Sequence, residues 1–552
     1  MKNMIQRLTL VALALTLLVA TIGWIGNHTI SSAEAEESAS STPEYASLFE
    51  GDRIINVNVT IDDADWESIL AAPLDKEYKS VSVEVDGHQL DHVGFSTKGN
   101  MTLRSVASME DSDRYSFRLK FDKYDKTQTL LGLDKMVLNN NYSDPSYLRE
   151  YLHYEALRSI GLDVPMTTFV NLYVNGELFG FYTGVESVDD SYLERNYGED
   201  YKDGILYDTD EKSYLQTEEN GEYSTLTEDL GTDENKARLK NFIQVLNDMP
   251  EGEKGDIESV LDVDSALKYI AGNVVLGNYD SYNGDKGHNY MLYGDADGKF
   301  TVIPWDFNMS FNGYGGGRGG TSSDSEGSGN TNATNVSVDE PVLGISMDKV
   351  PMINNLLEVP EYKTQYLEYV NQLVDDLESI EDRITVLSDL IRPSVEADPT
   401  KFYTMEQFES NIIYTAIGDM GDMKGSGMPP SDGLQGMTPP DDAAPTNGVG
   451  NAAPPNGAAS PVGQQGTTPP EGFTPPEGSM APPAKPGGTT GGEKGASASG
   501  NGGNRGGMGL IASGSITSFA LNRLANLQEQ LGREVVELLA ATNTGAASVT
   551  SD

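Results

Sequence analysis

The sequence of 552 residues predicts an α+β fold, with β-strands concentrated in the first third of the chain and helices dominating the remainder. Between residues 53 and 185, several short runs carry an apolar residue at every second position. Asp86-Gly87 and Asn175-Gly176 lie between pairs of these runs and are typical of tight hairpin turns. After about residue 233 the apolar spacing becomes helical. The length suits one large domain or two ordinary ones.

The expected strands are alternating apolar and polar runs bounded by turn residues. They are 53–61, 81–85, 90–95, 115–121, 168–174 and 178–185. A helix start is expected at Asp62–Trp66, and a small polar loop at Ser96–Asn100. In the strand 115–121, Arg118 and Lys120 alternate with apolar residues, so both cations should lie on the face opposite the core.

Helices are expected where capping residues flank an apolar stripe. One should begin near Asp144-Pro145 and end at Gly161, and another should span about 190–196 after Glu186. The expected helices further along are 266–276, 350–357, 361–377, 380–391 and 405–414. This order suggests one domain over 51–415, with a β-rich lobe over about 51–186 and a mainly helical lobe over about 187–415.

Two stretches lack the apolar periodicity that a packed core needs. Residues 313–338 are rich in Gly, Ser and Asn and are expected to form a mobile loop. Residues 419–509 are rich in Pro, Gly, Ala and Met, which predicts a disordered insertion. An amphipathic helix within 515–535, with Phe519 and Leu527 on its apolar face, should then close the domain.

The chain is strongly acidic, with 85 acidic and 37 basic residues and a formal net charge of −48. Such a surface repels nucleic acid and anionic lipid, so we expect no nucleic-acid partner. It favours cations or basic protein substrates, although a solvated acidic surface without a partner is the simpler alternative. The chain has no cysteine, which excludes disulfides, thiolate metal ligands and cysteine nucleophiles.

Residues 1–35 have the features of an export segment. Lys2 and Arg7 precede an apolar run from Leu8 to about Ile25, and Ala33-Glu34-Ala35 offers a cleavage site. The run is also long enough for an uncleaved membrane anchor. Both alternatives predict a secreted or cell-surface protein of Gram-positive type. A spacer over 36–50 should join the export segment to the domain over 51–415. Membrane contact is expected only through this segment, if it is not cleaved.

Three polar residues in the second half are candidates for chemistry. Asp280 opens a turn-rich loop after an apolar helix, Asn289 begins an apolar strand, and Asp306 ends the next one. Kinase-type phosphoryl transfer uses one carboxylate to orient the acceptor hydroxyl, and an amide and a second carboxylate to hold magnesium. The spacing therefore predicts Asp280 as catalytic residue and Asn289 and Asp306 as ligands of Mg²⁺ or Mn²⁺. Asp285 is the alternative to Asp280, and an ordinary acidic turn is the alternative to catalysis.

Phosphate binding also needs a fixed cation, and Arg118 or Lys120 is the candidate. A glutamate of the following helix should orient that cation. We expect Glu155 in this role because it lies beside the apolar stripe, whereas Glu150 lies further toward solvent. Glu186 stands where a connector between two lobes would run, and its side chain is a candidate for nucleotide contact. A solvated outer face and a helix N-terminal charge are the alternatives for the cations and for Glu186.

Five separated motifs, in order along the chain, resemble the CotH kinase family, named for spore-coat protein H. They are Asn141–Glu150, Gly161–Pro165, Leu172–Tyr182 with Val185-Glu186, His288–Tyr293 and Phe300–Asp306. The resemblance covers roughly residues 50–415 and, beyond the insertion, the closing helix. The chain has Asn308 where the family often has a further acid, which leaves a second metal contact open.

The resemblance implies a divergent bilobal protein-kinase-like fold that uses ATP and Mg²⁺ or Mn²⁺ to phosphorylate Ser or Thr in coat or extracellular proteins. It implies Asp280 as the catalytic Asp, Asn289 and Asp306 as metal ligands, and a basic residue of the strand 117–121 on the phosphates. The expected substrate is a basic, Ser-rich coat or surface protein. There are two alternatives: another ATP-dependent transfer on the same fold, or a pseudokinase that serves as a structural spore-coat or cell-wall protein.

Overall fold

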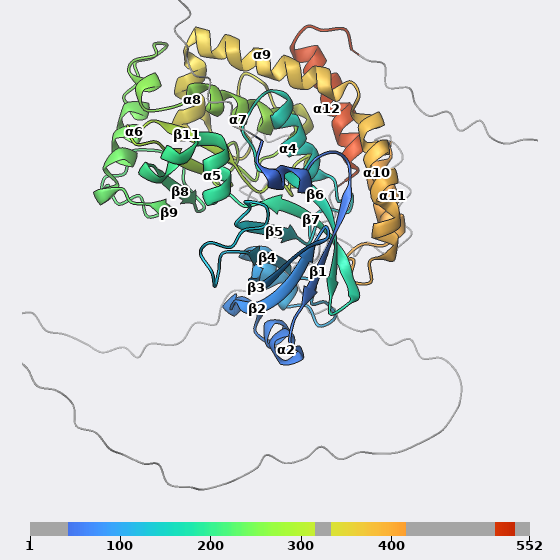
Figure 1. Ribbon diagram of the computed structural model, residues 1–552. Coiled ribbons are helices and arrows are strands. Elements are labelled where there is room, and N and C mark those ends of the chain that lie inside the picture. Colours follow the sequence, from blue (N-terminus) through green and yellow to red (C-terminus); the bar gives the residue numbers. More distant parts are fainter. Residues whose placement is uncertain (1–41, 315–332, 416–513, 536–552) are drawn as a thin grey trace, which may run out of the picture. The chain divides into compact units, whose positions relative to one another are not determined.

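The computed structural model of the protein describes residues 42–314, 333–415 and 514–535 (Figure 1). The predicted export segment 1–35, the insertion 419–509 and most of the loop 313–338 lie outside the described residues. In the described part, no helix combines the length and the apolar character that crossing a membrane requires.

The N-terminal region is a closed barrel of seven strands in the order β1-β2-β3-β4-β5-β7-β6. Its strands are β1 (Ile54–Thr60), β2 (Lys79–Val85), β3 (His88–Lys98), β4 (Ser116–Lys120), β5 (Lys135–Asn139), β6 (Thr167–Val174) and β7 (Glu177–Glu186). Neighbouring strands are antiparallel except β1 and β6, whose parallel pairing closes the barrel. Phe95 and Phe117 stack inside it with ring centroids 4.8 Å apart, so the alternating apolar residues fill the interior.

Short helices cover the barrel and lead out of it. They are α2 (Asp63–Ala71), α3 (Met101–Ala107) and α4 (Arg149–Ser159), with α5 (Asp190–Tyr197) following β7. The α4 helix is buried along most of its length, including its polar residues Arg149, Glu150 and His153. It therefore packs between elements instead of presenting a solvated face.

The rest of the described chain combines a four-stranded antiparallel sheet with helices (Figure 1). The sheet has the order β11-β10-β8-β9, from β8 (Ile205–Thr209), β9 (Leu226–Gly231), β10 (Tyr290–Gly294) and β11 (Phe300–Pro304). The helices are α6 (Ala237–Asn247), α7 (Val263–Val275), α8 (Pro351–Glu358), α9 (Pro360–Leu377), α10 (Ile380–Ala397), α11 (Met405–Ile412) and α12 (Ile516–Gln530).

The α12 helix is integrated in the core of this region. Arg523 is fully buried and donates hydrogen bonds to the backbone carbonyls of Val274, Thr334 and Val336. Phe519 meets Phe311 edge-on, with ring centroids 6.2 Å apart. The helix thus joins the end of α7 to the segment that precedes α8.

A buried ion pair connects the barrel to the end of α10. Arg114, just before β4, lies 2.6 Å from the carboxylate of Asp398, and both side chains are fully buried. Arg114 also donates to the carbonyl of Asn140, and the backbone N–H of Phe181 donates to Asp398. The chain after α10 therefore returns to the barrel and is fixed there.

The predicted α+β composition, with a β-rich N-terminal region, is confirmed. Every predicted strand occurs within a few residues of its expected position, and Arg118 and Lys120 lie on the outer face of β4 as expected. The strands β5, β8 and β9 and the closure of the barrel were not predicted. Helix α10 is longer than expected because it continues through Pro393 to Ala397.

Candidate functional site

The loop that carries Asp280 runs from α7 to β10 and is held by buried amides. Asn278 donates to the side-chain oxygen of Asn273 at 2.9 Å, and Asn273 donates in turn to Asn283 at 3.3 Å. The turn closes tightly at Gly284, where a Cβ atom would lie 1.7 Å from the carbonyl oxygen of Tyr279. Glycine is thus required at this position, and the network orders the loop around Asp280.

Two neighbours in the same loop restrain Asp280. His288 Nε2 lies 2.7 Å from Asp280 Oδ1, and Asn289 Nδ2 donates to the backbone carbonyl of Asp280 at 2.7 Å. Burial would lower the pKa of His288, but its hydrogen bond to Asp280 and the charges of Asp280, Asp306 and Glu211 raise it above its usual value. His288 therefore fixes one Asp280 oxygen.

Asp306 follows β11 in a left-handed backbone conformation with φ of 57°. The next residue, Phe307, stacks on His153 of α4 with ring centroids 3.7 Å apart and nearly parallel planes. Burial raises the pKa of Asp306 and the charge of Asp280 adds to this, whereas the charge of Lys98 acts in the opposite sense. The aromatic stack therefore fixes the Asp306 turn against α4, in the electrostatic field of both Asp280 and Lys98.

A chain of polar contacts joins Lys98 to α4. Lys98, the last residue of β3, donates to Asn139 Oδ1 at 2.8 Å, and Asn139 Nδ2 donates to both carboxylate oxygens of Glu150 at 3.0 and 2.8 Å. Burial and the charge of Asp306 raise the pKa of Glu150 to about 7. The Lys98 ammonium group also lies 5.9 Å from the centroid of Trp305. Lys98 and Glu150, which the sequence analysis did not select, are thus a cation and a glutamate that interact electrostatically with Asp306.

The predicted cations of β4 have different surroundings. Lys120 lies 3.0 Å from Asp122 and 3.4 Å from Asp189, so carboxylates already neutralise it. Arg118 pairs in register with Ser96 of β3, on the same outer face as Lys98, and makes no ion pair in the part of the chain that the structure describes. Of the two candidates, Arg118 is the one left available for an anion beside Lys98.

The structure does not bring the other candidates to this cluster. Glu155 forms an ion pair with Arg383 of α10. Glu186 is fully buried, accepts hydrogen bonds from Tyr45 and the backbone of Met166, and pairs with Arg195 at 2.7 Å, so it anchors the connector instead of facing a ligand. These placements correct the expectations for both glutamates.

The rival residue Asp285 lies in the same loop as Asp280 but has different partners. Its carboxylate accepts a hydrogen bond from Tyr314 at 2.9 Å, and its backbone carbonyl accepts one from Tyr214. Among the acids of this loop, Asp280 is the one whose charge acts on Asp306, so the structure associates Asp280 with the cluster.

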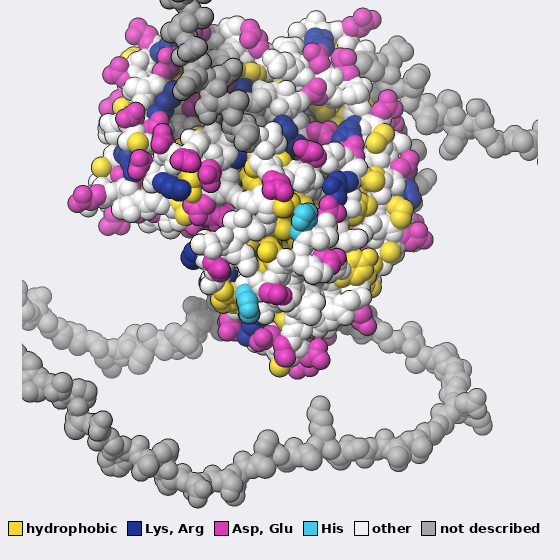
Figure 2. Space-filling model, in the orientation of Figure 1, with side chains coloured by type: hydrophobic (Ala, Val, Ile, Leu, Met, Phe, Trp, Pro, Cys, Tyr) yellow, Lys and Arg dark blue, Asp and Glu magenta, His cyan; other side chains and the backbone are white. Residues whose placement is uncertain are grey.

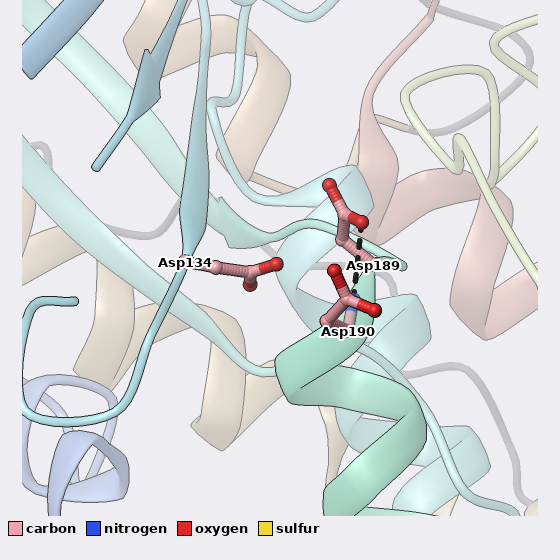
Figure 3. Close-up of side chains that lie close together, drawn as sticks. All are labelled: Asp134, Asp189 and Asp190. Carbon is pink, nitrogen blue, oxygen red and sulfur yellow. Dashed lines mark hydrogen bonds between the residues drawn. The ribbon is translucent and has the colours of Figure 1, made fainter. Parts of the chain in front are cut away.

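A second group of carboxylates lies near the start of α5, where Asp134, Asp189 and Asp190 approach one another (Figure 3). Asp189 pairs with Lys135 at 2.5 Å and with Lys120, while Ser191 donates to Asp134. Burial and the charge of Asp189 raise the pKa of Asp134 to about 6. The two lysines pair with Asp189, and Asp134 and Asp190 accept hydrogen bonds from Ser191 and Tyr201, so we assign the three acids a structural role at the connector.

Asp280, Asn289 and Asp306 offer oxygen atoms as ligands, whereas both carboxylate oxygens of Glu150 already accept hydrogen bonds from Asn139. Carboxylate and amide oxygens suit Mg²⁺ and Mn²⁺, whereas zinc and copper favour imidazole or thiolate. Three acids face Lys98 and His288 at the meeting of the barrel, α4 and the β10–β11 sheet. The donor set therefore fits a divalent cation with phosphate oxygens, and the assigned roles of these residues stay predictions.

Comparisons with known proteins place the chain in a family. The profile described as CotH kinase protein matches residues 95–416, more than half of the chain. Inner spore coat protein H of Bacillus subtilis (strain 168) is 27% identical over 318 residues, covering 54% of this chain and 79% of that protein. Inner spore coat protein H-like protein of the same organism is 26% identical over 166 residues, covering 28% and 50%. The resemblance seen in the sequence motifs is thereby confirmed, and the chain belongs to the CotH kinase protein family.

Proposed function

We propose that the protein transfers the γ-phosphate of ATP to Ser or Thr hydroxyls of protein substrates, with Mg²⁺ or Mn²⁺ as cofactor. The observation that carries this proposal is the convergence of Lys98, Asn139 and Glu150 from the barrel side on Asp306 and the Asp280 loop. A strand cation linked to a helix glutamate, opposite a metal-binding aspartate, is the arrangement that protein kinases use. On this proposal the barrel and the helical region act as the two lobes of a divergent kinase-like fold.

In the proposed reaction, Asp280 orients the acceptor hydroxyl and receives its proton as the hydroxyl oxygen bonds to the γ-phosphorus. The bond from the γ-phosphorus to the bridging oxygen breaks, and ADP leaves with that oxygen. Lys98 and Arg118 neutralise phosphate charge, and Glu150 positions Lys98 through Asn139. Asp306 and Asn289 would hold the cation, which supplies charge neutralisation between the phosphates. Positioning and preorganised charge would provide most of the rate.

The family relatives support the setting of this reaction. Both are named as inner spore coat proteins, which favours a coat or surface location for this chain. The net charge of −48 favours a basic partner, so a basic, Ser-rich coat or surface protein is the proposed substrate.

The test is single-turnover transfer from γ-labelled ATP to a basic Ser-rich protein, with Mn²⁺ or Mg²⁺, by the full chain. Asp280→Asn should retain nucleotide binding and lose about 10²–10⁴-fold of the transfer rate, the usual effect of a missing catalytic base. Asp285→Asn is the matched control in the same loop and should have little effect, because its carboxylate bonds Tyr314.

Three other outcomes would contradict the proposal in different ways. Nucleotide binding without transfer by the parent protein would show a pseudokinase. Transfer of a group other than the γ-phosphate would show a different ATP-dependent transferase. Greater sensitivity at Asp285 than at Asp280 would show that the catalytic carboxylate is assigned wrongly.

A further inference from the structure

A small cavity lies on the four-stranded sheet, at the end of the sheet opposite the candidate site. It has a volume of about 140 Å³ and is enclosed by α5, the 3₁₀ turn that follows it, and the strands β8, β9 and β10. Most of its lining is apolar or aromatic and includes Leu193, Tyr201, Ile205, Leu230 and Tyr293. A cavity of roughly 150 Å³ holds one benzene-sized group. The cavity can therefore receive a single side chain of a partner.

The wall of the cavity beside β9 is made of backbone. Gly231, the last residue of β9, pairs with Ile205 of β8 and has φ of 81°. A Cβ atom on Gly231 would lie 2.3 Å from the carbonyl oxygen of Gly204, so a side chain there would force the two strands apart. Gly231 is exposed, and Lys202 on the rim is exposed as well. A partner can thus reach the cavity from solvent.

The rim of the cavity carries one carboxylate. Asp190, the first residue of α5, accepts a hydrogen bond from the Tyr201 hydroxyl at 2.8 Å. No ion pair among the described residues includes Asp190, whereas its neighbour Asp189 pairs with two lysines. Lys202 is the one basic residue of the lining, and its Nζ lies 5.4 Å from the centroid of the Tyr201 ring. An apolar cavity with a carboxylate at its rim fits a Lys or Arg side chain, which has an apolar stem and a charged end.

The surface around the cavity is more acidic than the chain as a whole. Residues 199–234 contain 13 acidic and two basic residues, compared with 85 and 37 in the whole chain. Glu228 and Asp229, on β9 itself, are both exposed. Acidic side chains are numerous in Figure 2 over the region where Figure 1 places β8 and β9. A basic segment is therefore attracted to this part of the protein in particular.

The sheet leads from the cavity to the candidate site. β10 begins beside the candidate site and ends at Gly294, which pairs with Ile205 at the cavity. The segment after β8 contacts the loop of Asp280, since the N–H of Ser213 donates to the carbonyl of Gly287 at 2.9 Å. β9 is the outer strand, and no further strand of the described residues pairs with it, so an extended segment can lie along it. The length of β10 is about 15 Å, which an extended segment of about five residues spans.

We propose that this cavity and the acidic surface of β9 form a docking site for a Lys- or Arg-rich segment of the protein substrate. The identity of the partner as substrate rests on the proposed function. One Lys or Arg side chain enters the cavity beside Leu193 and Leu230, with its charged end at Asp190 and the Tyr201 ring. Further basic residues lie over the acids of β9. The Ser or Thr that receives the phosphate then lies at least about five residues from the anchor along the substrate.

The first experiment measures binding of a fluorescent peptide of alternating Arg and Ser to the full chain, without nucleotide, by anisotropy at low salt. Asp190→Asn should weaken binding by about tenfold, because one charge-assisted contact is lost. Leu230→Trp fills the cavity and keeps every charge, and it should weaken binding by a similar factor. Lys202→Ala removes the competing cation and should strengthen binding by about threefold, a gain that a misfolded variant cannot give.

Glu381→Gln/Asp382→Asn is the control. Both acids are exposed on α10, remote from β9 in Figure 1, so binding should change by less than about twofold. A loss in this control as large as that in Asp190→Asn would overturn the docking site and show attraction to the acidic surface in general. Unchanged binding in both Leu230→Trp and Lys202→Ala would overturn it as well.

The second experiment separates the docking site from the proposed function. With a basic Ser-rich protein as substrate, Leu230→Trp should raise the KM for that protein by about tenfold and leave kcat within about twofold. The cavity is remote from the reacting groups, so filling it should not change the transfer step. Transfer with an unchanged KM would overturn the docking site alone. Binding of the peptide at the cavity by a parent protein that transfers no phosphate would contradict the proposed function and confirm the basic-segment site.

Discussion

The buried pair of Arg114 and Asp398 should be the most sensitive ionic contact between the barrel and the helical region. Both side chains have an exposed fraction of 0%. Asp398→Asn keeps the shape of the side chain but leaves the Arg114 guanidinium buried without its anion. Breaking a buried pair in this way costs about 3–5 kcal/mol of unfolding free energy. A protein with a typical unfolding free energy of about 5–15 kcal/mol would lose a large part of its stability.

The assay is urea unfolding followed by tryptophan fluorescence. Trp66 packs against Phe95 and Phe179 of the barrel, and Trp305 lies beside Lys98, so two of the three tryptophans report on both parts. The double variant Arg114→Met/Asp398→Asn should cost less than the sum of the single variants, because it leaves no buried charge without a partner.

Arg383→Met is the matched control. Arg383 pairs with Asp52 and Glu155, but its side chain is 26% exposed and those of its partners are 33% and 35% exposed. Solvent screens such pairs, which are worth about 1 kcal/mol or less. If Asp398→Asn destabilises the protein no more than Arg383→Met does, the buried pair is not the contact that holds the two parts together.

Three further predictions concern other parts of the chain. Asp134→Asn should raise the thermal midpoint at pH 7.5 and leave it unchanged near pH 4. Burial raises the pKa of Asp134 in the folded protein to about 6. The stability that protonation of this carboxyl group contributes is therefore present below its unfolded pKa and lost as pH rises through 6. Deleting 419–509 should barely move the thermal midpoint, because Thr415 and Ser518, on either side of that stretch, are already hydrogen-bonded at 2.7 Å; a large fall would show that the deleted residues stabilise the core. Arg523→Met should destabilise the protein to urea by about 3 kcal/mol, because several buried carbonyls lose their donor; an unchanged midpoint would show that α12 is held by its apolar face alone.

The strands of the barrel were predictable because alternation is a local property. The run that became β4 places Phe117 and Leu119 inside the barrel and Arg118 outside, as its period of two indicates. The closure of the barrel was not predictable from such a local pattern. It depends on the parallel pairing of β1 with β6, for example Ile54 with Phe169, and no local pattern connects positions so far apart.

The catalytic candidates of the second half were recognisable because their spacing around a hairpin is distinctive, and the structure brings Asp280 and Asp306 into one electrostatic environment. Lys98 was missed because Ser96–Asn100 has the composition of a polar loop, whereas β3 continues through it to Lys98. The apolar stripe of the helix favours Glu155 over Glu150 because it marks one buried side only. The first turn of α4 is also buried, since Asn139 supplies the hydrogen bonds that the carboxylate needs there.

The position of α12 in the core makes folding depend on the far end of the chain. The groove between α7 and the segment before α8 receives Phe519 and Arg523 only after residues 416–513 have been synthesised. Until then the apolar residues that α12 covers face solvent, and the carbonyls that Arg523 satisfies lack their donor. A polypeptide that stops within 416–513 would keep this surface exposed and remain a substrate for chaperones and proteases. The core of this region is therefore complete only once α12 has been synthesised.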